Sequence, residues 1–322
     1  MLAHPRFAYT RGLHELGNGA YAYLQPDGSW GWSNAGLIVD AGRSLLVDTL
    51  FDLRLTAEML AAMRAAEPRA AARIGTLVNT HSNGDHTFGN ALAEGAEIIA
   101  TAACAEEMAR EGPAALLAFQ RRAPEMGALG AYALHCFGAF RFDDVEVRLP
   151  TRLFSDRLEL AVGAKRVELL EVGPAHTRGD LLVVVPGDRV VFTGDILFID
   201  GTPIVWAGPV ARWIEACRRI EAMDVDVVVP GHGPITDRRG AAAVRGYLEY
   251  VRGEARRRYD AGLSARDAAF DIALGDYSAW GDAERIAVNV ATLYREFSGD
   301  TKPADVVELF DRMSEIYRQR RR

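Results

Sequence analysis

The order of hydrophobic and polar positions along the first part of the chain predicts strands that alternate with helices. The segments "NAGLIVD" and "RSLLVDTLFD", separated by Ala41 and Gly42, predict a hairpin of half-buried strands. The segment "LTAEMLAAMRAAEP" places Leu, Met and Ala at helical spacing and stops at Pro68. The β-branched run "RIGTLVNT" follows it, and "AEIIAT" and "AACAEEMAREG" then predict a further strand and a further helix. The local order is therefore strand, loop and helix.

The strand pattern returns in the second half, after a segment from about 113 to 142 that has no clean period and that we expect to be a partly helical insertion. The predicted strands are "VEVRLP", "LFSDRLELAV", "RVELLEV", "LLVVVP" and "RVVFTGD", separated by turn signals at Gly163, Gly173-Pro174 and Pro186-Gly187. A helix "VARWIEACRRIEAM" and a strand "VDVVVPGHGP" follow. From about Asp237 onward the pattern predicts helices almost throughout.

No linker-like composition separates the strand-rich part from the C-terminal helices. We therefore predict a domain over residues 1–236, with its insertion at about 113–142, and a helical extension over 237–322 that packs on the same core. A separate helical lobe is the alternative. The segment "ERIAVNVATLYREF" has apolar residues at helical spacing and predicts a packed amphipathic helix, with a pocket lid or a homodimer face through the C-terminal helices as the sharper alternative.

Composition limits the classes of partner. The chain of 322 residues is 49% hydrophobic and 25% charged, which is typical of a globular protein, and its net charge of −7 argues against a nucleic-acid partner. The three cysteines are far apart and lack C-x-x-C spacing, so we expect neither a disulfide framework nor a cysteine zinc site. No export-type N-terminal pattern and no run of about 18 apolar residues is present, which predicts a cytoplasmic protein with no membrane partner.

Four of the seven histidines stand at predicted strand ends, beside glycine or acidic residues. They are His81, His86, His176 and His232, and Asp195 occupies the same kind of position. Active sites of layered α/β folds gather at strand ends, where loops from distant segments converge on a rigid scaffold. A lone strand-end histidine is more often a satisfied polar residue than a ligand. Five such positions in this order favour a functional site.

These motifs resemble those of the metallo-β-lactamase superfamily, over roughly Asn34 to Pro234. The first motif of that family has the form H-x-H-x-D-H and here stands as His81-Ser82-Asn83-Gly84-Asp85-His86, with Asn83 in place of a histidine. The later motifs match at His176 in "GPAHTRGD", Asp195 in "FTGDILF" and His232 in "VPGHGP". The resemblance implies an α/β fold, the four-layer αββα sandwich, with a helical insertion and a helical C-terminal extension.

The resemblance also implies two metal positions. One would be held by His81, the residue at position 83 and His176, the other by Asp85, His86 and His232, with Asp195 bridging the two. Imidazole and carboxylate are the ligands of zinc in catalytic sites, so we predict one or two zinc ions, with iron or manganese as alternatives. An amide oxygen is a poorer donor than an imidazole, and we therefore hypothesise one tight and one weak site. Gly231 and Gly233 would let the backbone approach the site closely.

The predicted function is that of a metal-dependent hydrolase. A metal-bound hydroxide, available because bound water has a pKa of about 7, would attack an acyl carbon of a small-molecule thioester, ester or lactone, and Asp85 or Asp195 would help to orient it. The alternatives are a non-hydrolytic enzyme, either a mononuclear iron oxygenase or a cyclase or dehydratase on a polyketide-like intermediate, and a metal-binding protein without catalysis. Trp206 and Trp213 are predicted to wall an apolar substrate pocket, with core packing of both rings as the competing interpretation. His135 as a substitute ligand is disfavoured against an ordinary position in the insertion.

Overall fold

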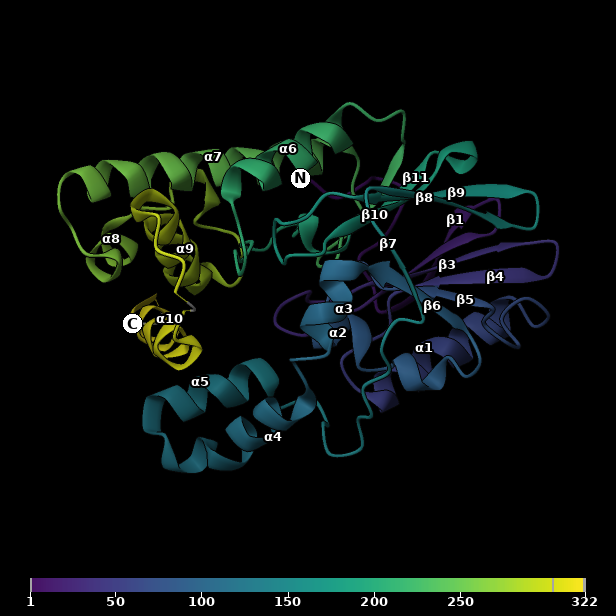
Figure 1. Cartoon of the computed structure of the whole chain (residues 1–322), viewed down its shortest axis with the longest axis horizontal. Helices are drawn as coiled ribbons and strands as arrows, with labels where there is room; N and C mark the ends of the chain where they lie inside the picture. The colour runs from purple at the N-terminus through teal and green to yellow at the C-terminus, as the bar shows by residue number, and fades with distance from the viewer. Residues whose placement is uncertain (1, 303, 321–322) are drawn as a thin grey trace.

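Two β-sheets face each other on one side of the molecule, at the right in Figure 1. The structure, a computed structural model, describes residues 2–302 and 304–320. The first sheet contains, in spatial order, β1 (Gly12–Gly17), β2 (Ala20–Leu24), β3 (Ala35–Asp40), β4 (Arg43–Val47), β5 (Thr76–Val78), β6 (Glu97–Thr101) and β7 (Arg152–Phe154). The second contains β12 (Val227–Val229), β11 (Val190–Phe192), β10 (Leu181–Val185), β9 (Lys165–Glu171) and β8 (Arg157–Val162).

Helices cover the outer faces of the two sheets (Figure 1). On the side of the first sheet lie α1 (Leu53–Ala66), α2 (Gly84–Thr87) and α3 (Ala102–Met108), and on the side of the second lie α6 (Val210–Glu221) and α7 (Arg238–Asp260). The insertion contributes α4 (Pro113–Arg122) and α5 (Gly127–Phe137), and the C-terminal part contributes α8 (Ala265–Asp271), α9 (Ile286–Ser298) and α10 (Val306–Arg320). Two short 3₁₀ turns matter for the site, η4 (Gly194–Ile196) and η6 (Ala283–Arg285).

Strand β10 shows why these residues form a layered sandwich. Its residues are all buried, and because side chains alternate along a strand they enter two different apolar layers. Leu181, Val183 and Val185 belong to the layer between the sheets. Leu182 and Val184 belong to the layer between the sheet and the helices. A strand covered on both faces is a continuous hydrophobic run rather than an alternating one, which explains the sequence "LLVVV".

Helix α1 packs one apolar face against the first sheet. Its N-terminus is capped by Asp52, whose side chain accepts a hydrogen bond of 2.7 Å from the backbone N–H of Leu55. The buried side chains Leu55, Met59 and Met63 recur every four residues and so lie on one face of the helix. The apolar residues whose spacing predicted this helix are therefore the ones that it buries.

The predicted elements are present with two exceptions. The segment "LFSDRLELAV", predicted as one strand, is divided between β7 of the first sheet and β8 of the second. The expected hairpin is formed by β3 and β4, which are paired antiparallel, and the insertion is partly helical as predicted. The prediction of a strand at "VEVRLP", residues 145–150, is wrong, because this segment has no regular structure and it is Arg152–Phe154 that pairs with β6. Strands β1 and β2 were not predicted, since the small residues of "AYAYL" give no clear alternation.

The C-terminal helices share the main buried cluster. Tyr247 of α7, Val290 of α9 and Met313 of α10 belong to the same cluster as Leu55 of α1. The domain boundary near residue 236 itself stays a prediction. Among the helices of the described residues, none has the length and apolar character needed to cross a membrane.

Shortening a side chain between the sheets should destabilise the fold. Leu169 of β9 is fully buried in this layer, and we expect Leu169→Ala to lower the free energy of unfolding by about 2–5 kcal/mol, because the cavity it leaves cannot collapse fully. The matched control is Leu153→Ala, where the leucine is 52% exposed and the loss should stay within about 0.5 kcal/mol. The measurement is the shift of the urea unfolding midpoint, and equal shifts in the two variants would contradict the layer assignment.

Candidate metal centre

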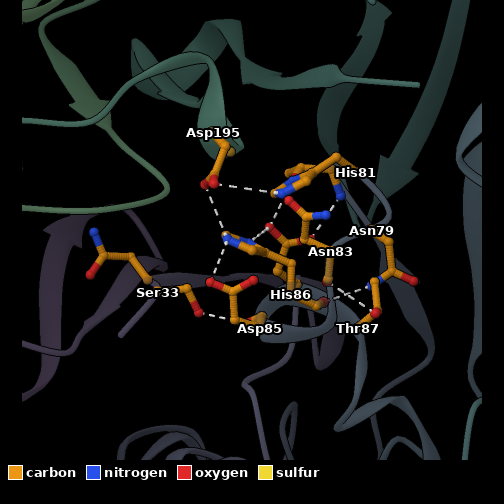
Figure 2. Close-up of polar contacts among 12 residues, drawn as sticks. Ser33, Asn79, His81, Asn83, Asp85, His86, Thr87 and Asp195 are labelled. Carbon is orange, nitrogen blue, oxygen red and sulfur yellow. Dashed lines mark hydrogen bonds and ion pairs between the residues drawn. The ribbon is translucent and has the colours of Figure 1, made fainter. Parts of the chain in front are cut away.

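The predicted site residues meet at one edge of the sandwich, where strands of both sheets end. His81 and α2 follow β5, His176 follows β9, Asp195 lies in η4 after β11, and His232 follows β12. Figure 2 shows His81, His86 and Asp195 directed toward one another, with Asp85 and Asn83 beside them. Convergence of loops from separate strands thus brings together residues up to 151 positions apart in sequence, from His81 to His232.

The six predicted histidine and aspartate ligands form two groups of three. His81, His176 and Asp195 form one group, and Asp85, His86 and His232 form the other, with the potential ligand atoms of each group within 4.8 Å of one another. Asn83 lies at the first group, with its Oδ1 2.8 Å from Nε2 of His176. The structure therefore brings all seven residues to one place, in the grouping that the resemblance implied.

Asp195 lies at the centre of this arrangement. Its Oδ2 is 3.3 Å from Nε2 of His176, 3.4 Å from Nε2 of His232 and 3.7 Å from Nε2 of His81. Its Oδ1 is 3.1 Å from Nε2 of His86. One carboxylate therefore lies close to all four imidazoles, at the position for which a bridging ligand was predicted, and the bridging role itself stays a prediction.

Three of the four imidazoles are oriented by acceptors at Nδ1. The Nδ1 of His86 lies 2.9 Å from Oδ2 of Asp48, that of His176 lies 2.7 Å from the carbonyl oxygen of Ile204, and that of His232 lies 3.0 Å from the carbonyl oxygen of Gly28. A carbonyl or carboxylate oxygen only accepts, so Nδ1 carries the proton and donates it. In the neutral imidazole the lone pair is then on Nε2, which faces the centre of the site.

The fourth imidazole is held through Thr80. The hydroxyl of Thr80 donates to Oδ2 of Asp48 over 2.7 Å, and its oxygen lies 3.0 Å from Nδ1 of His81, from which it accepts. The backbone N–H of Thr80 also donates to Oδ1 of Asp48 over 2.7 Å. Asp48 therefore orients His86 directly and His81 through one hydroxyl. Sequence reasoning missed Asp48, although it ends the strand of "SLLVD" in the same way that Asp195 follows its strand.

Burial and the neighbouring charges together set the pKa values of the cluster. Burial by itself raises the pKa of Asp195, but the neighbouring imidazoles of His232, His86 and His81 hold that pKa well below its usual range. Burial lowers the pKa of His81 well below its ordinary value, and the imidazole of His86 adds to this. For His86 the carboxylates of Asp195, Asp85 and Asp48 outweigh burial and raise the pKa. Ionised Asp195 and the imidazole of His81, which burial keeps neutral, are a donor pair suited to a divalent cation.

Unpartnered atoms at the centre fit a bound cation. In the described part of the chain, Nε2 of His81, Nε2 of His86 and Oδ1 of Asp195 are buried and make no hydrogen bond, although the last two atoms lie 3.1 Å apart. Buried polar atoms without a partner are rare and require an explanation such as an ion. A Cβ at Gly231 would collide with the carboxylate of Asp195, so glycine there leaves room for the close approach that was predicted. The residues present therefore fit a metal site.

A cavity of about 1130 Å³ lies over the candidate metal centre. Its floor includes Asn83, Asp85, His176, Asp195 and His232. Its walls carry many aromatic side chains, namely Trp30, Phe51, Phe88, Phe137, Phe198, Trp206 and Phe310. Charged side chains, among them Arg110, Arg178 and Arg295, also line it, so the walls combine aromatic and charged groups. Largely apolar pockets with a limited set of polar groups are the usual form of a small-molecule site.

The two tryptophans predicted to wall the pocket differ. Trp206 lines the cavity, as predicted. The prediction for Trp213 is wrong, because this side chain is fully buried, donates from Nε1 to the carbonyl oxygen of Ile196 over 2.9 Å and does not line the cavity. Its ring instead packs edge-on against His176, with 5.7 Å between ring centroids. Trp213 therefore packs against the imidazole of His176, a candidate metal ligand, from outside the cavity.

The insertion and the C-terminal helices form the far side of the cavity. Phe310 of α10 lies 5.7 Å from Phe137 of α5, 5.6 Å from Trp30 and 6.5 Å from Trp206 between ring centroids. His135 of α5 stacks on Tyr317 and does not line the cavity, so it has the ordinary insertion position that was favoured over a ligand role. The cavity is thus completed by two segments far apart in sequence.

This chain matches a family model and a protein of known name. The model of a family described as the metallo-beta-lactamase superfamily matches residues 28–232. A relative, the 2,4-dinitroanisole O-demethylase subunit alpha of Nocardioides sp. (strain JS1661), is 28% identical over 195 residues, which cover 58% of this chain and 48% of that protein. The chain thus spans about half the length of that relative.

Solved structures agree with the fold. The inverting sec-alkylsulfatase Pisa1 from Pseudomonas sp. superposes with a TM-score of 0.66 at 20% identity, covering 92% of this chain and 52% of that one. A metallo-beta-lactamase from Pontibacter korlensis superposes with a TM-score of 0.55 at 16% identity, covering 74% of this chain and 99% of that one. At these identities the likeness concerns the fold alone.

Removing the carboxylate of Asp48 should weaken metal binding. We expect Asp48→Asn to lower the affinity for zinc by about 10- to 100-fold, because the ring of His86 and, through Thr80, that of His81 lose the acceptor that orients them. Competition with a chelating dye measures this affinity. The control is Asp224→Asn at an aspartate whose side chain is 87% exposed, and a similar loss in both variants would show that Asp48 has no special role.

Proposed function

The chain belongs to the metallo-β-lactamase superfamily, whose members are metal-dependent hydrolases, and we propose that it is a zinc-dependent hydrolase of apolar acyl compounds. The observation that carries this proposal is the convergence of four Nε2 atoms and two carboxylates on one centre at the floor of an aromatic cavity. Zinc is proposed because imidazole and carboxylate are its preferred donors in catalytic sites. Iron and manganese accept the same donors and are the alternatives to be tested.

A divalent cation held by these residues would supply a water of pKa near 7, and so a nucleophile at neutral pH. Asp195 and Asp85 are proposed to orient that water and to hold its proton, since both carboxylates reach the centre. Oδ2 of Asp85 lies 3.2 Å from Nε2 of His232. Helix α2, which carries Asp85, is fixed by the hydroxyl of Ser33, which donates to the backbone oxygen of Asp85 over 2.5 Å (Figure 2).

The walls of the cavity support an apolar, ring-bearing substrate. Aromatic side chains exclude water, which strengthens electrostatic interactions at the floor, and they offer stacking surfaces to a ring. We propose thioesters, esters and lactones of such compounds as substrates, because a carbonyl carbon is the electrophile that a hydroxide at this position would attack. A cytoplasmic location and a homodimer through the C-terminal helices remain predictions.

A second candidate is the cleavage of an aryl ether. The relative from Nocardioides is named for O-demethylation of 2,4-dinitroanisole, an aryl methyl ether, and the sequence match covers 58% of this chain. The aromatic walls suit an arene as well as they suit an acyl ring compound. The predicted alternatives, an iron oxygenase and a cyclase or dehydratase, differ from both because they do not add water to the substrate.

Metal analysis combined with labelled water separates these functions. The protein is purified without added metal, its metals are measured per chain, and it is assayed on phenyl esters, an aryl thioester, a lactone and dinitroanisole in ¹⁸O-water. We expect zinc and incorporation of ¹⁸O into the carboxylic acid product. Label in the phenol would indicate attack on the arene of an ether, whereas iron with oxygen uptake, or turnover without label, would refute the hydrolase. Folded protein that binds no metal would refute all metal-dependent candidates.

Asn83 should weaken zinc binding at the first group of candidate ligands, which contains His81, His176 and Asp195. The neutral ring of His176 has its lone pair on Nε2, and the amide oxygen of Asn83 faces it at 2.8 Å. Two acceptors face each other favourably only across a cation or after the amide turns its NH₂ toward the ring. We expect Asn83→His to raise the zinc content from about one to about two ions per chain, because an imidazole is a better zinc donor than an amide oxygen.

The control for Asn83 is Asn83→Ala, which removes the side-chain donor and should not raise the zinc content. Zinc per chain, measured by elemental analysis after dialysis, is the readout and does not depend on activity. Two tightly held ions in the unmodified protein would contradict the prediction of a weak first site.

A further inference from the structure

We propose that Trp30 and Arg285 form a hydrogen-bonding subsite that binds an acceptor oxygen carried by a ring of the ligand. The inference rests on the proposed function in that it concerns the same cavity, but it concerns recognition rather than the reaction. Both residues line the cavity, and neither belongs to the candidate metal centre.

Trp30 presents an unused donor. It lies in the loop between β2 and β3, is 8% exposed, and packs between Phe137 and Phe310 with ring centroids 5.8 Å and 5.6 Å away. Among the described residues its Nε1 is buried and has no hydrogen-bond acceptor. Buried indole N–H groups usually find a partner, as that of Trp213 does in this protein.

Arg285 presents a second unused donor on the same indole. It belongs to η6 and is 2% exposed. One terminal nitrogen donates to the carbonyl oxygen of Thr202 over 3.0 Å, and the other pairs with Asp282 at 2.9 Å. Its Nε is buried and lacks an acceptor within the described ranges 2–302 and 304–320. The guanidinium carbon lies 4.5 Å from the ring centroid of Trp30, so the guanidinium packs on the indole that carries the first donor.

The position of the subsite relative to the metal centre is set by Phe198. The guanidinium of Arg285 lies 5.3 Å from the ring centroid of Phe198 on one side. The same phenyl ring stacks on His232 with a centroid distance of 5.0 Å and an interplanar angle of 3°. One ring therefore separates the guanidinium of Arg285 from a candidate metal ligand. A ligand that lies along Phe198 would reach the donors with a group across its ring from the atom at the metal centre.

The charge of the subsite indicates which acceptor it suits. Asp282 is paired with Arg285, so the guanidinium is already balanced by one carboxylate. The N–H groups of Trp30 Nε1 and Arg285 Nε remain without an acceptor among the described residues. An uncharged oxygen, such as a ketone or nitro oxygen, can accept from them as well as an anion can. A site built to hydrogen-bond a polar group discriminates strongly against ligands that lack it. We infer a preference for rings that carry an acceptor oxygen over purely hydrocarbon rings of the same size.

Two phenols of nearly equal shape test this inference without any bond to cleave. 4-Hydroxyacetophenone carries a ketone oxygen across the ring from its hydroxyl, and 4-isopropylphenol carries a hydrocarbon group of similar size. Their dissociation constants are measured by calorimetry on the full chain loaded with zinc. We expect Trp30→Phe and Arg285→Lys to weaken 4-hydroxyacetophenone by about fivefold to tenfold and to leave 4-isopropylphenol within about twofold.

The matched control is Trp206→Phe, which makes the same ring change elsewhere in the cavity and should affect both phenols equally. Trp30→Phe keeps an aromatic ring under Arg285 and so tests the donor even if Arg285→Lys fails to fold. Equal weakening of the two phenols, unchanged binding of both, or no binding of either phenol to the unmodified protein would each overturn the subsite. Since neither phenol is hydrolysed, loss of the proposed hydrolase activity alone would leave the result intact.

Discussion

The site depends on the hydrogen bonds that the carboxylate of Asp48 accepts. Asp48 directly follows β4, which pairs in parallel with β5, and its backbone N–H donates to the carbonyl oxygen of Val78 over 2.9 Å. This pairing places Asp48 beside the loop that begins at Asn79, where its two oxygens bind Thr80 and His86. The register between β4 and β5 therefore determines how the imidazoles of His86 and His81 are oriented. A shift of one residue would turn Asp48 to the opposite face of the sheet and leave both rings without support.

Much of the fold and of the metal centre could be predicted from the sequence, because both follow from local patterns. Buried strands such as "LLVVV" are continuous hydrophobic runs, and the ligands sit directly after such runs in short motifs. The strand predicted at "VEVRLP" was wrong because alternation alone does not supply a neighbouring strand to pair with. Trp213 was misplaced for a related reason, since its direction is fixed by a bond to Ile196 that no local pattern reveals.

The cavity could not be predicted in the same way, because its walls come from segments that meet only in three dimensions. Phe137 of the insertion, Phe310 of α10 and Trp30 of an early loop are neighbours in space and distant in sequence. The candidate metal ligands lie at the floor, and these three side chains form part of the walls. The two parts are built on different elements, so substitutions in α5 or α10 can change which compounds enter while the strand ends keep the metal centre unchanged.

The acceptors behind the four imidazoles differ in their tolerance of mutation. Those of His86 and His81 are the side chains of Asp48 and Thr80, and a single nucleotide change can delete either one. Those of His176 and His232 are main-chain carbonyls, which every amino acid carries. Any residue at position 204 therefore supplies the acceptor for His176, provided that its side chain fits the space that Ile204 fills. Position 28 also supplies its acceptor from the main chain, but it requires glycine, because φ is +81° and a Cβ would strike Gly233.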